Sequence, residues 1–190
     1  MPARRRSFAA VVKAAEQALR AAGVEHVFVG ALAVGAFGVP RTTTDVDVIV
    51  RYEVEDARRL AEVFRRHGFR VPVADLQDAL AEGSHATIHD TLSEFHVDLA
   101  PAVRPTARDA IQRLIRVRWR GVVLPIADPE HTIVMKLKFG SDQDVEDALG
   151  IYIRQRKRLD VRQMREFARR QGVLEALRDL ERKVVSGENR

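Results

Sequence analysis

The sequence of 190 residues predicts an α+β fold, in which a core that contains the sheet is followed by a region built only of helices. Short β-branched runs with strand alternation all lie before Ala127, whereas apolar residues at helical spacing fill the chain after it. An apolar content of 46% with 31% charged residues is typical of a folded globular chain. We therefore expect a core domain over residues 1–127 and a helical region over residues 128–190, packed on that core.

Helices and strands alternate in the first part of the chain, and Gly23, Pro40 and Gly68 are the stop signals between them. The predicted elements are a helix over Phe8–Ala22, a strand over His26–Gly30, a short helix over Ala31–Gly38, a strand over Asp45–Val50 and an amphipathic helix over Val54–His67.

The middle of the chain predicts further strands. Residues 69–73 read as an edge or irregular strand because Pro72 cannot donate to a ladder, and no element is predicted for residues 74–83. Two strand-like runs over residues 84–90 and 94–100 are close enough for a hairpin, and 105–114 is a helix candidate. Residues 115–127 predict two strands around Gly121.

The helical region begins at a strong start signal, because Asp128 suits an N-cap and Pro129 the first helical position. Four helices are expected there, over residues 129–139, 142–154, 161–171 and 173–184.

Composition narrows the chemistry. The chain has no cysteine, which excludes disulfides, thiolate metal sites and cysteine nucleophiles. No apolar run has the length of a membrane span, and charged residues interrupt the N-terminal segment too often for a signal peptide, so we expect no membrane association and a cytoplasmic location. The net charge of +5 supports a polyanionic partner only weakly.

Asp45 and Asp47 lie one residue apart in an otherwise apolar strand, so both side chains point to the same face. Two adjacent carboxylates repel each other unless a cation lies between them, and an oxygen-only donor set favours Mg²⁺. The alternative is a solvated strand face that binds nothing. A turn at Gly30 follows a strand and opens a helix, and its backbone N–H groups suit phosphate, which favours the site.

These residues resemble the signature of the DNA polymerase β-like nucleotidyltransferase superfamily: Val29, Gly30, Ala31, a spacer, then Asp45-Val46-Asp47-Val48. More narrowly, the chain resembles minimal bacterial nucleotidyltransferases, including the toxins of type IV toxin–antitoxin systems. That resemblance includes Arg41 and Thr43, and a helix with Lys136 followed by Asp144 and Asp147. The sequence departs from the signature at Ala31, where the family has glycine or serine.

The resemblance implies a nucleotidyltransferase-like mixed sheet flanked by helices and assigns roles to the residues. Asp45, Asp47 and Asp98 would be the catalytic carboxylates and would bind one or two Mg²⁺ ions. The residues that would bind the nucleoside triphosphate are Gly30, Ala31, Arg41, Thr43 and Lys136. A surface role for Arg41, a loop-capping role for Thr43 and a solvent-directed Lys136 are the open alternatives, and Asp144 and Asp147 would orient Lys136 or an arginine.

Three histidines, His85, His89 and His96, fall in the strand region. A zinc site is disfavoured because they form no open-site motif. His96 points with Asp98 if the strand is regular, which would place it near the carboxylates.

The implied activity is transfer of a nucleoside monophosphate from an NTP to an acceptor hydroxyl, with RNA, at the 3′ end of tRNA, as the leading acceptor. A toxin role would bring an antitoxin protein as partner. Two alternatives stay open: the same chemistry on a protein or small-molecule hydroxyl, and a degenerate, non-catalytic protein that binds nucleotide or RNA, which Ala31 motivates.

Overall fold

The computed structural model describes residues 5–187, so the ends of both predicted regions, residues 1–4 and 188–190, lie outside the described part. The helices are α1 Phe8–Ala22, α2 Gly30–Phe37, α3 Asp56–Arg66, α4 Val73–Glu82, α5 Pro105–Gln112, α6 Pro129–Phe139, α7 Asp142–Gln155, α8 Val161–Gln171 and α9 Leu174–Gly187. The strands are β1 Glu25–Phe28, β2 Asp45–Arg51, β3 Phe69–Arg70, β4 Ala86–Asp90, β5 His96–Pro101, β6 Leu114–Trp119 and β7 Val122–Ala127.

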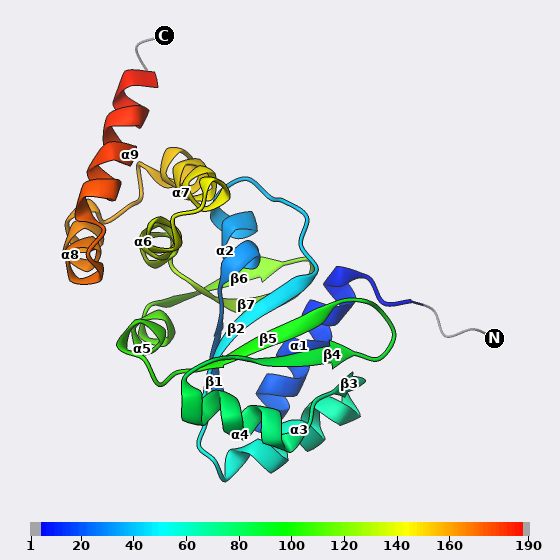
Figure 1. The fold of residues 1–190 in the computed structure, drawn as a ribbon. Helices are drawn as coiled ribbons and strands as arrows, with labels where there is room; N and C mark the ends of the chain where they lie inside the picture. Colours follow the sequence, from blue (N-terminus) through cyan, green and yellow to red (C-terminus); the bar gives the residue numbers. More distant parts are fainter. Residues whose placement is uncertain (1–4, 188–190) are drawn as a thin grey trace.

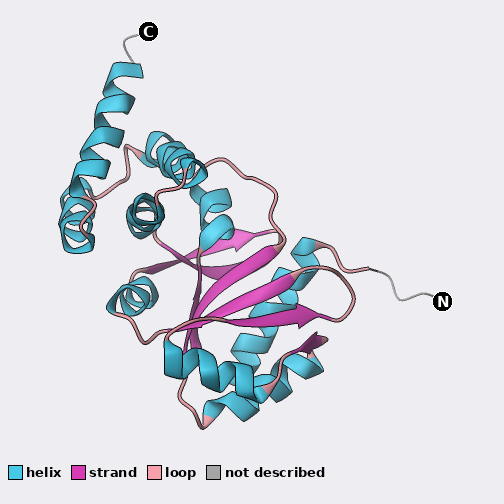
Figure 2. Ribbon diagram, in the orientation of Figure 1, coloured by secondary structure: helices cyan, strands magenta, loops and turns pink. Residues whose placement is uncertain are grey.

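The strands form one mixed sheet in the order β3-β4-β5-β2-β1-β7-β6. The pairs β2–β5 and β1–β7 are parallel, and the other neighbours are antiparallel. Figure 1 shows α6 to α9 gathered at one end of the molecule beside α2, with α3 and α4 at the other end. The predicted α+β class with a mixed sheet flanked by helices is confirmed, and Figure 2 shows the helices around the strands.

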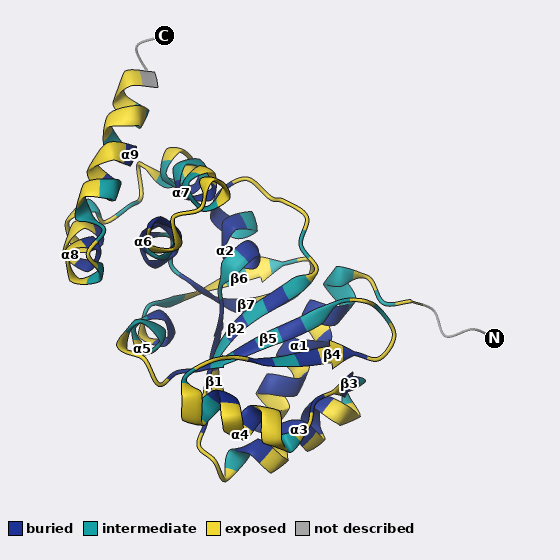
Figure 3. Ribbon diagram, viewed as in Figure 1, coloured by how far each residue is buried: buried dark blue, intermediate teal, exposed yellow. Residues whose placement is uncertain are grey.

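β2 lies in the middle of the sheet, and its alternation divides its side chains between two environments. Val46, Val48 and Val50 are buried in the main core. Ile49, on the other face, packs against a small second cluster that contains Val27. Figure 3 shows this alternation of buried and half-buried residues along β2. The core therefore holds one face of β2 in place while its aspartates face away from it.

The predicted helix start at Asp128 is confirmed. The Asp128 side chain accepts a hydrogen bond from the His131 backbone N–H, and Pro129 occupies the first turn of α6. Gly140, in the left-handed conformation, ends this helix. Helices α6 and α7 both contact α2, so the helical region lies against the core, while the division at residue 127 stays a prediction.

The edge strand predicted over residues 69–73 is confirmed only at its start, as β3, which is an outermost strand of the sheet. A helix that was not predicted, α4, begins at Val73. Pro72 lacks a backbone N–H, which is why it suggests an edge strand. In the structure it is the N-cap residue of α4. A proline fits there as well, because the N–H groups at the start of a helix have no partner within the helix. Leu76 and Ala79 are the buried residues of this helix, and their spacing of three is the helical signal in this segment.

Candidate active site

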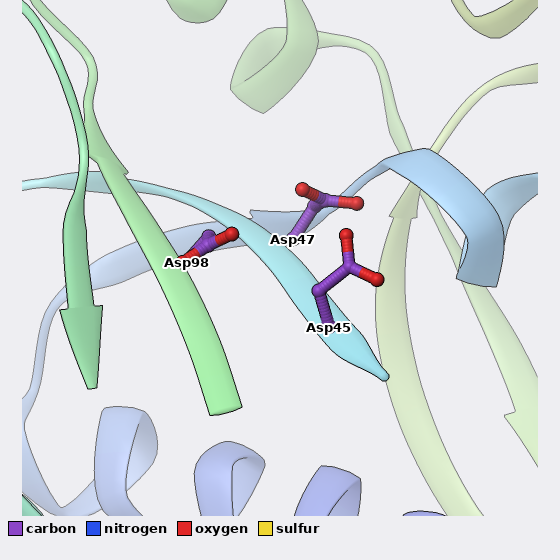
Figure 4. A group of neighbouring side chains, drawn as sticks. All are labelled: Asp45, Asp47 and Asp98. Carbon is purple, nitrogen blue, oxygen red and sulfur yellow. The ribbon is translucent and has the colours of Figure 1, made fainter. Parts of the chain in front are cut away.

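Three carboxylates meet where β2 and β5 run side by side. The two strands are parallel, with Asp47 opposite Asp98 and Asp45 opposite His96. One carboxylate oxygen from each of Asp45, Asp47 and Asp98 lies within 4.8 Å of the other two. Figure 4 shows Asp45 and Asp47 projecting from β2, with Asp98 on the neighbouring strand. The structure therefore brings together the three aspartates expected to act as one site.

Mutual repulsion and burial raise the cost of charging this cluster. Burial, followed by the charges of Asp45 and Asp98, raises the pKa of Asp47 to about 6, although Lys136 and Arg41 act in the opposite direction. A carboxyl with such a pKa is a strong candidate for a cation ligand, because a bound cation offsets the repulsion.

Asp45 is held differently. Burial acts to raise the pKa of Asp45, but the hydrogen bond from Thr43 Oγ1, with the charges of His96 and Arg41, outweighs burial and leaves this pKa below its ordinary value. Thr43 therefore contacts a carboxylate of the site through its hydroxyl.

Asp98 is oriented by its neighbours on the sheet. Thr87 Oγ1, on β4, donates a hydrogen bond of 2.8 Å to Asp98 Oδ1. The Nε2 atom of His96 lies 3.7 Å from Asp98 Oδ2, so His96 does point with Asp98, as expected. One oxygen of Asp98 is thus fixed by Thr87, while the other faces an imidazole.

Gly30, the first residue of α2, touches Asp47. Its φ of +57° is in the left-handed region, and a Cβ atom built on it would lie 1.9 Å from Asp47 Oδ2. The Val29 N–H donates to the Asp47 carbonyl at 3.0 Å, which ties the same turn to β2. Glycine is thus required twice over, by the backbone conformation and by the carboxylate beside it.

Lys136 does not extend into solvent. Its side chain is 9% exposed, and its Nζ lies 2.7 Å from Asp144 Oδ1 and 3.0 Å from Asp147 Oδ2. Arg41 Nε donates to Asp147 Oδ2 at 3.3 Å. Asp147 therefore links the two cations, and the expectation that these α7 aspartates orient Lys136 or an arginine agrees with the contacts. Lys138, on the same helix, bonds Gln171 instead.

A cavity of about 320 Å³ opens beside the carboxylates. It is lined by Val29, Gly30, Ala31, Arg41, Asp45, Asp47, Ile49, His131, Thr132, Met135, Lys136 and Phe139. Most of the residues expected to bind nucleotide or metal therefore face one space. Thr43 and Asp98 lie next to it, through their contacts with Asp45 and Asp47, but do not line it.

The other α6 residues of this cavity were not predicted. Met135 is half-buried, and Phe139 is 69% exposed at the end of the helix. His131 stacks on Phe167 at a ring distance of 5.2 Å, and burial lowers its pKa. The sequence alone does not identify Phe139 as a cavity residue, because it lines the cavity only where the fold brings α6 and β2 to the same space.

The donor set suits a hard cation. All three converging side chains are carboxylates, which is the ligand chemistry of Mg²⁺, and an oxygen cluster under mutual repulsion gains by binding a positive ion. Within residues 5–187 this is the one group of three metal-ligand side chains that converges closely enough to share an ion.

Comparison with solved structures identifies the fold. No protein-family model matches the sequence, and no curated protein matches it. The chain is similar to ANT(2'')-Ia in complex with adenylyl-2''-tobramycin, with TM-score 0.56, 13% identity and coverage of 94% of this chain and 99% of that one. The solution structure of the antibiotic-resistance factor ANT(2'')-Ia gives TM-score 0.54 at 12% identity, covering 94% of this chain and 95% of that one.

The lincosamide antibiotic adenylyltransferase LnuA in its lincomycin-bound form is similar too, with TM-score 0.50, 11% identity and coverage of 77% of this chain and 99% of that one. At such identities the likeness shows a shared fold. The chain therefore has the nucleotidyltransferase-like fold that the resemblance implied. Among residues 5–187, no helix combines the length and apolar character of a membrane span.

Proposed function

We propose that this chain is a metal-dependent nucleotidyltransferase, which moves a nucleoside monophosphate from an NTP to an acceptor hydroxyl. The observation that carries the proposal is the convergence of Asp45, Asp47 and Asp98 within 4.8 Å, directly beside Gly30. The fold shared with ANT(2'')-Ia and LnuA supports it.

In this proposal Asp45 and Asp47 hold the cation, with Asp98 completing the donor set. One or two Mg²⁺ ions bound there would neutralise charge on the triphosphate and lower the pKa of the attacking hydroxyl. Thr43 keeps the Asp45 carboxylate in place through its hydrogen bond. The backbone N–H groups of Gly30 and Ala31, at the start of α2, face the phosphates.

Asp98 accepts the proton from the acceptor hydroxyl, and Thr87 fixes its orientation. The bond from the acceptor oxygen to the α-phosphorus forms, and the bond from that phosphorus to the bridging oxygen breaks. Pyrophosphate leaves. Arg41 and the remaining donor of Lys136 offset its charge from the wall of the cavity, while Phe139 and Met135 offer apolar surface to the base.

RNA, at the 3′ end of tRNA, is the acceptor we propose. The neighbouring structures are named for tobramycin and lincomycin, which makes a small-molecule hydroxyl the second candidate. The basic chain, with net charge +5, favours the polyanion over a cationic aminoglycoside. The non-catalytic alternative would bind NTP without turnover.

An acceptor panel tests the proposal. Purified protein is incubated with Mg²⁺ and α-labelled NTPs, and separate reactions receive total tRNA, a protein mixture, tobramycin or lincomycin. We expect label in the tRNA, and its removal by Asp45→Asn plus Asp47→Asn. The matched control is Asp75→Asn plus Asp78→Asn, which changes two exposed aspartates on α4. Label in a small molecule alone would identify the second candidate, and label nowhere would contradict the proposed activity.

A toxin role belongs to the same proposal and has its own test. Expression of the wild-type chain should arrest growth, and expression of the double aspartate variant should not. Relief of the arrest by a co-expressed protein that binds this chain would identify an antitoxin. Equal growth with both forms would contradict the toxin role.

A further inference from the structure

A second cavity, of about 410 Å³, adjoins the first on the other side of Ala31 and Arg41. It lies among the start of α1, the body of α2 and the turn between β6 and β7. Its lining residues are Ser7, Phe8, Ala9, Ala31, Leu32, Gly35, Pro40, Arg41, Thr43, Trp119 and Arg120. The two cavities share Ala31 and Arg41, so a molecule in the second lies within reach of the carboxylates in the first.

The lining of this cavity is aromatic and cationic. Trp119 and Phe8 supply rings, Arg41 and Arg120 supply guanidinium groups, and none of the described lining residues is a carboxylate. The Arg120 guanidinium lies over the Trp119 ring, with its Cζ 5.6 Å from the ring centroid. A tryptophan beside arginines is the pair of groups by which proteins bind single-stranded nucleic acid, where bases stack on rings and phosphates pair with cations.

Arg120 is held in an unusual backbone conformation. Its φ is +44°, and within residues 5–187 it is the only non-glycine residue with a positive φ. A bulky side chain there costs conformational energy that a glycine would avoid. The turn thus carries an arginine where the backbone favours glycine, and that arginine lines the cavity.

We propose that this cavity binds one nucleotide of a single-stranded acceptor RNA, with the base against Trp119 and the phosphate paired with Arg120. Its volume is in the ordinary range for a small-ligand pocket, roughly 300–1,000 Å³. A polycationic acceptor is disfavoured there, because it would meet two arginines and no carboxylate among the described lining residues. This inference rests on the proposed function, whose acceptor it places.

The chain offers a direct readout, because Trp119 is its single tryptophan. Tryptophan fluorescence is followed while a single-stranded RNA of about eight nucleotides, long enough for one binding site, is added in EDTA. The RNA should quench the fluorescence in a saturable and salt-sensitive way, and ATP alone should not. RNA that binds without quenching, or ATP that quenches as strongly as RNA, would overturn the assignment of the cavity.

Two variants locate the effect. Gly35→Leu should fill the cavity, since a Cβ there meets only Pro40 Cβ, at 4.0 Å. Arg120→Glu reverses a lining charge, and its matched control is Arg118→Glu, an exposed arginine of β6 that does not line the cavity. Both lining variants should weaken RNA binding at least about tenfold, the loss expected from one stacked base or phosphate contact. If Arg118→Glu weakens RNA binding as much as Gly35→Leu and Arg120→Glu do, the proposal is overturned.

The fluorescence experiment separates this inference from the proposed activity. The variant Asp45→Asn plus Asp47→Asn lies outside the second cavity and should retain the quenching by RNA. Quenching without any nucleotidyl transfer would support the RNA site and contradict the activity. Transfer to RNA without quenching would support the activity and overturn the site.

Discussion

Asp47→Asn should stabilise the metal-free protein at the expense of activity. The folded protein raises the pKa of Asp47 from its ordinary 3.8 to about 6, first through burial and then through Asp45 and Asp98. Asp47 is therefore charged at neutral pH in a place that disfavours the charge. Asparagine has nearly the same shape and removes that charge.

The size and sign of the effect follow from proton linkage. A rise in pKa from 3.8 to about 6 corresponds to about 3 kcal/mol of lost stability once the pH exceeds both values. A carboxyl whose pKa is higher in the folded state than in the unfolded state costs no stability at low pH, where it is protonated in both states. It destabilises the folded state as the pH rises above its unfolded-state pKa. The gain from Asp47→Asn should thus grow between about pH 4 and pH 7 and be absent below that window.

Urea unfolding in EDTA measures the free energy of unfolding of both forms across this pH range. We expect Asp47→Asn to be more stable at about pH 8, by up to about 3 kcal/mol, and Mg²⁺ to stabilise the wild type more than the variant. Asp75→Asn, on the exposed side of α4, should change stability by less than about 0.5 kcal/mol. A variant that is less stable than the wild type at about pH 8 in EDTA would overturn this explanation of the carboxylate cluster.

Three further changes test the parts of the site. Gly30→Ala should abolish binding of NTP with Mg²⁺ in calorimetry, because its Cβ would collide with the Asp47 carboxylate. The control Gly121→Ala, at φ +83° with nothing within 4 Å of the added Cβ, should cost only about 1 kcal/mol of backbone strain. Equal binding by both variants would contradict a specific role for Gly30. Lys136→Met leaves two α7 aspartates without their shared cation and should lower the free energy of unfolding by about 3 kcal/mol or more. Lys138→Met, at an exposed lysine of the same helix, should lower it by less than about 0.5 kcal/mol, and similar losses in the two variants would exclude a buried ion-pair role. Ala31→Ser should tighten NTP binding about fivefold if the added hydroxyl donates to a phosphate, and unchanged affinity would show that alanine suffices.

Local patterns are enough to predict much of this site. Because side chains alternate along a strand, Asp45 and Asp47 must lie on the same face of β2. The packing of the sheet decides only which of the two faces this is. Gly30 is recognisable by its place between a strand and a helix. Its contact with Asp47 is not, because that contact depends on how closely α2 approaches β2.

Local patterns do not encode contacts between distant segments; in this site the roles of Asp98 and the α7 aspartates come only from the family resemblance. Asp98 joins the site because β5 is parallel to β2 and in register, which is a tertiary choice that no local pattern encodes. Asp147 meets Arg41 across 106 positions of chain, and Phe139 reaches the cavity only because α6 lies beside the sheet. Helix α4, in contrast, could have been predicted from local sequence. The spacing of its buried residues Leu76 and Ala79 indicates a helix, whereas Pro72 suggests an edge strand.

The two ends of the triphosphate can be followed separately, which tests the proposed chemistry at the carboxylates. The protein is incubated with Mg²⁺ and total tRNA, once with α-labelled NTP and once with γ-labelled NTP. If Asp45, Asp47 and Asp98 form a nucleotidyltransferase site, the α-label moves to the RNA and the γ-label appears in pyrophosphate, and Asp45→Asn plus Asp47→Asn stops both. Transfer of the γ-label to an acceptor, or α-label transfer that survives the double substitution, would contradict a nucleotidyltransferase site at these aspartates.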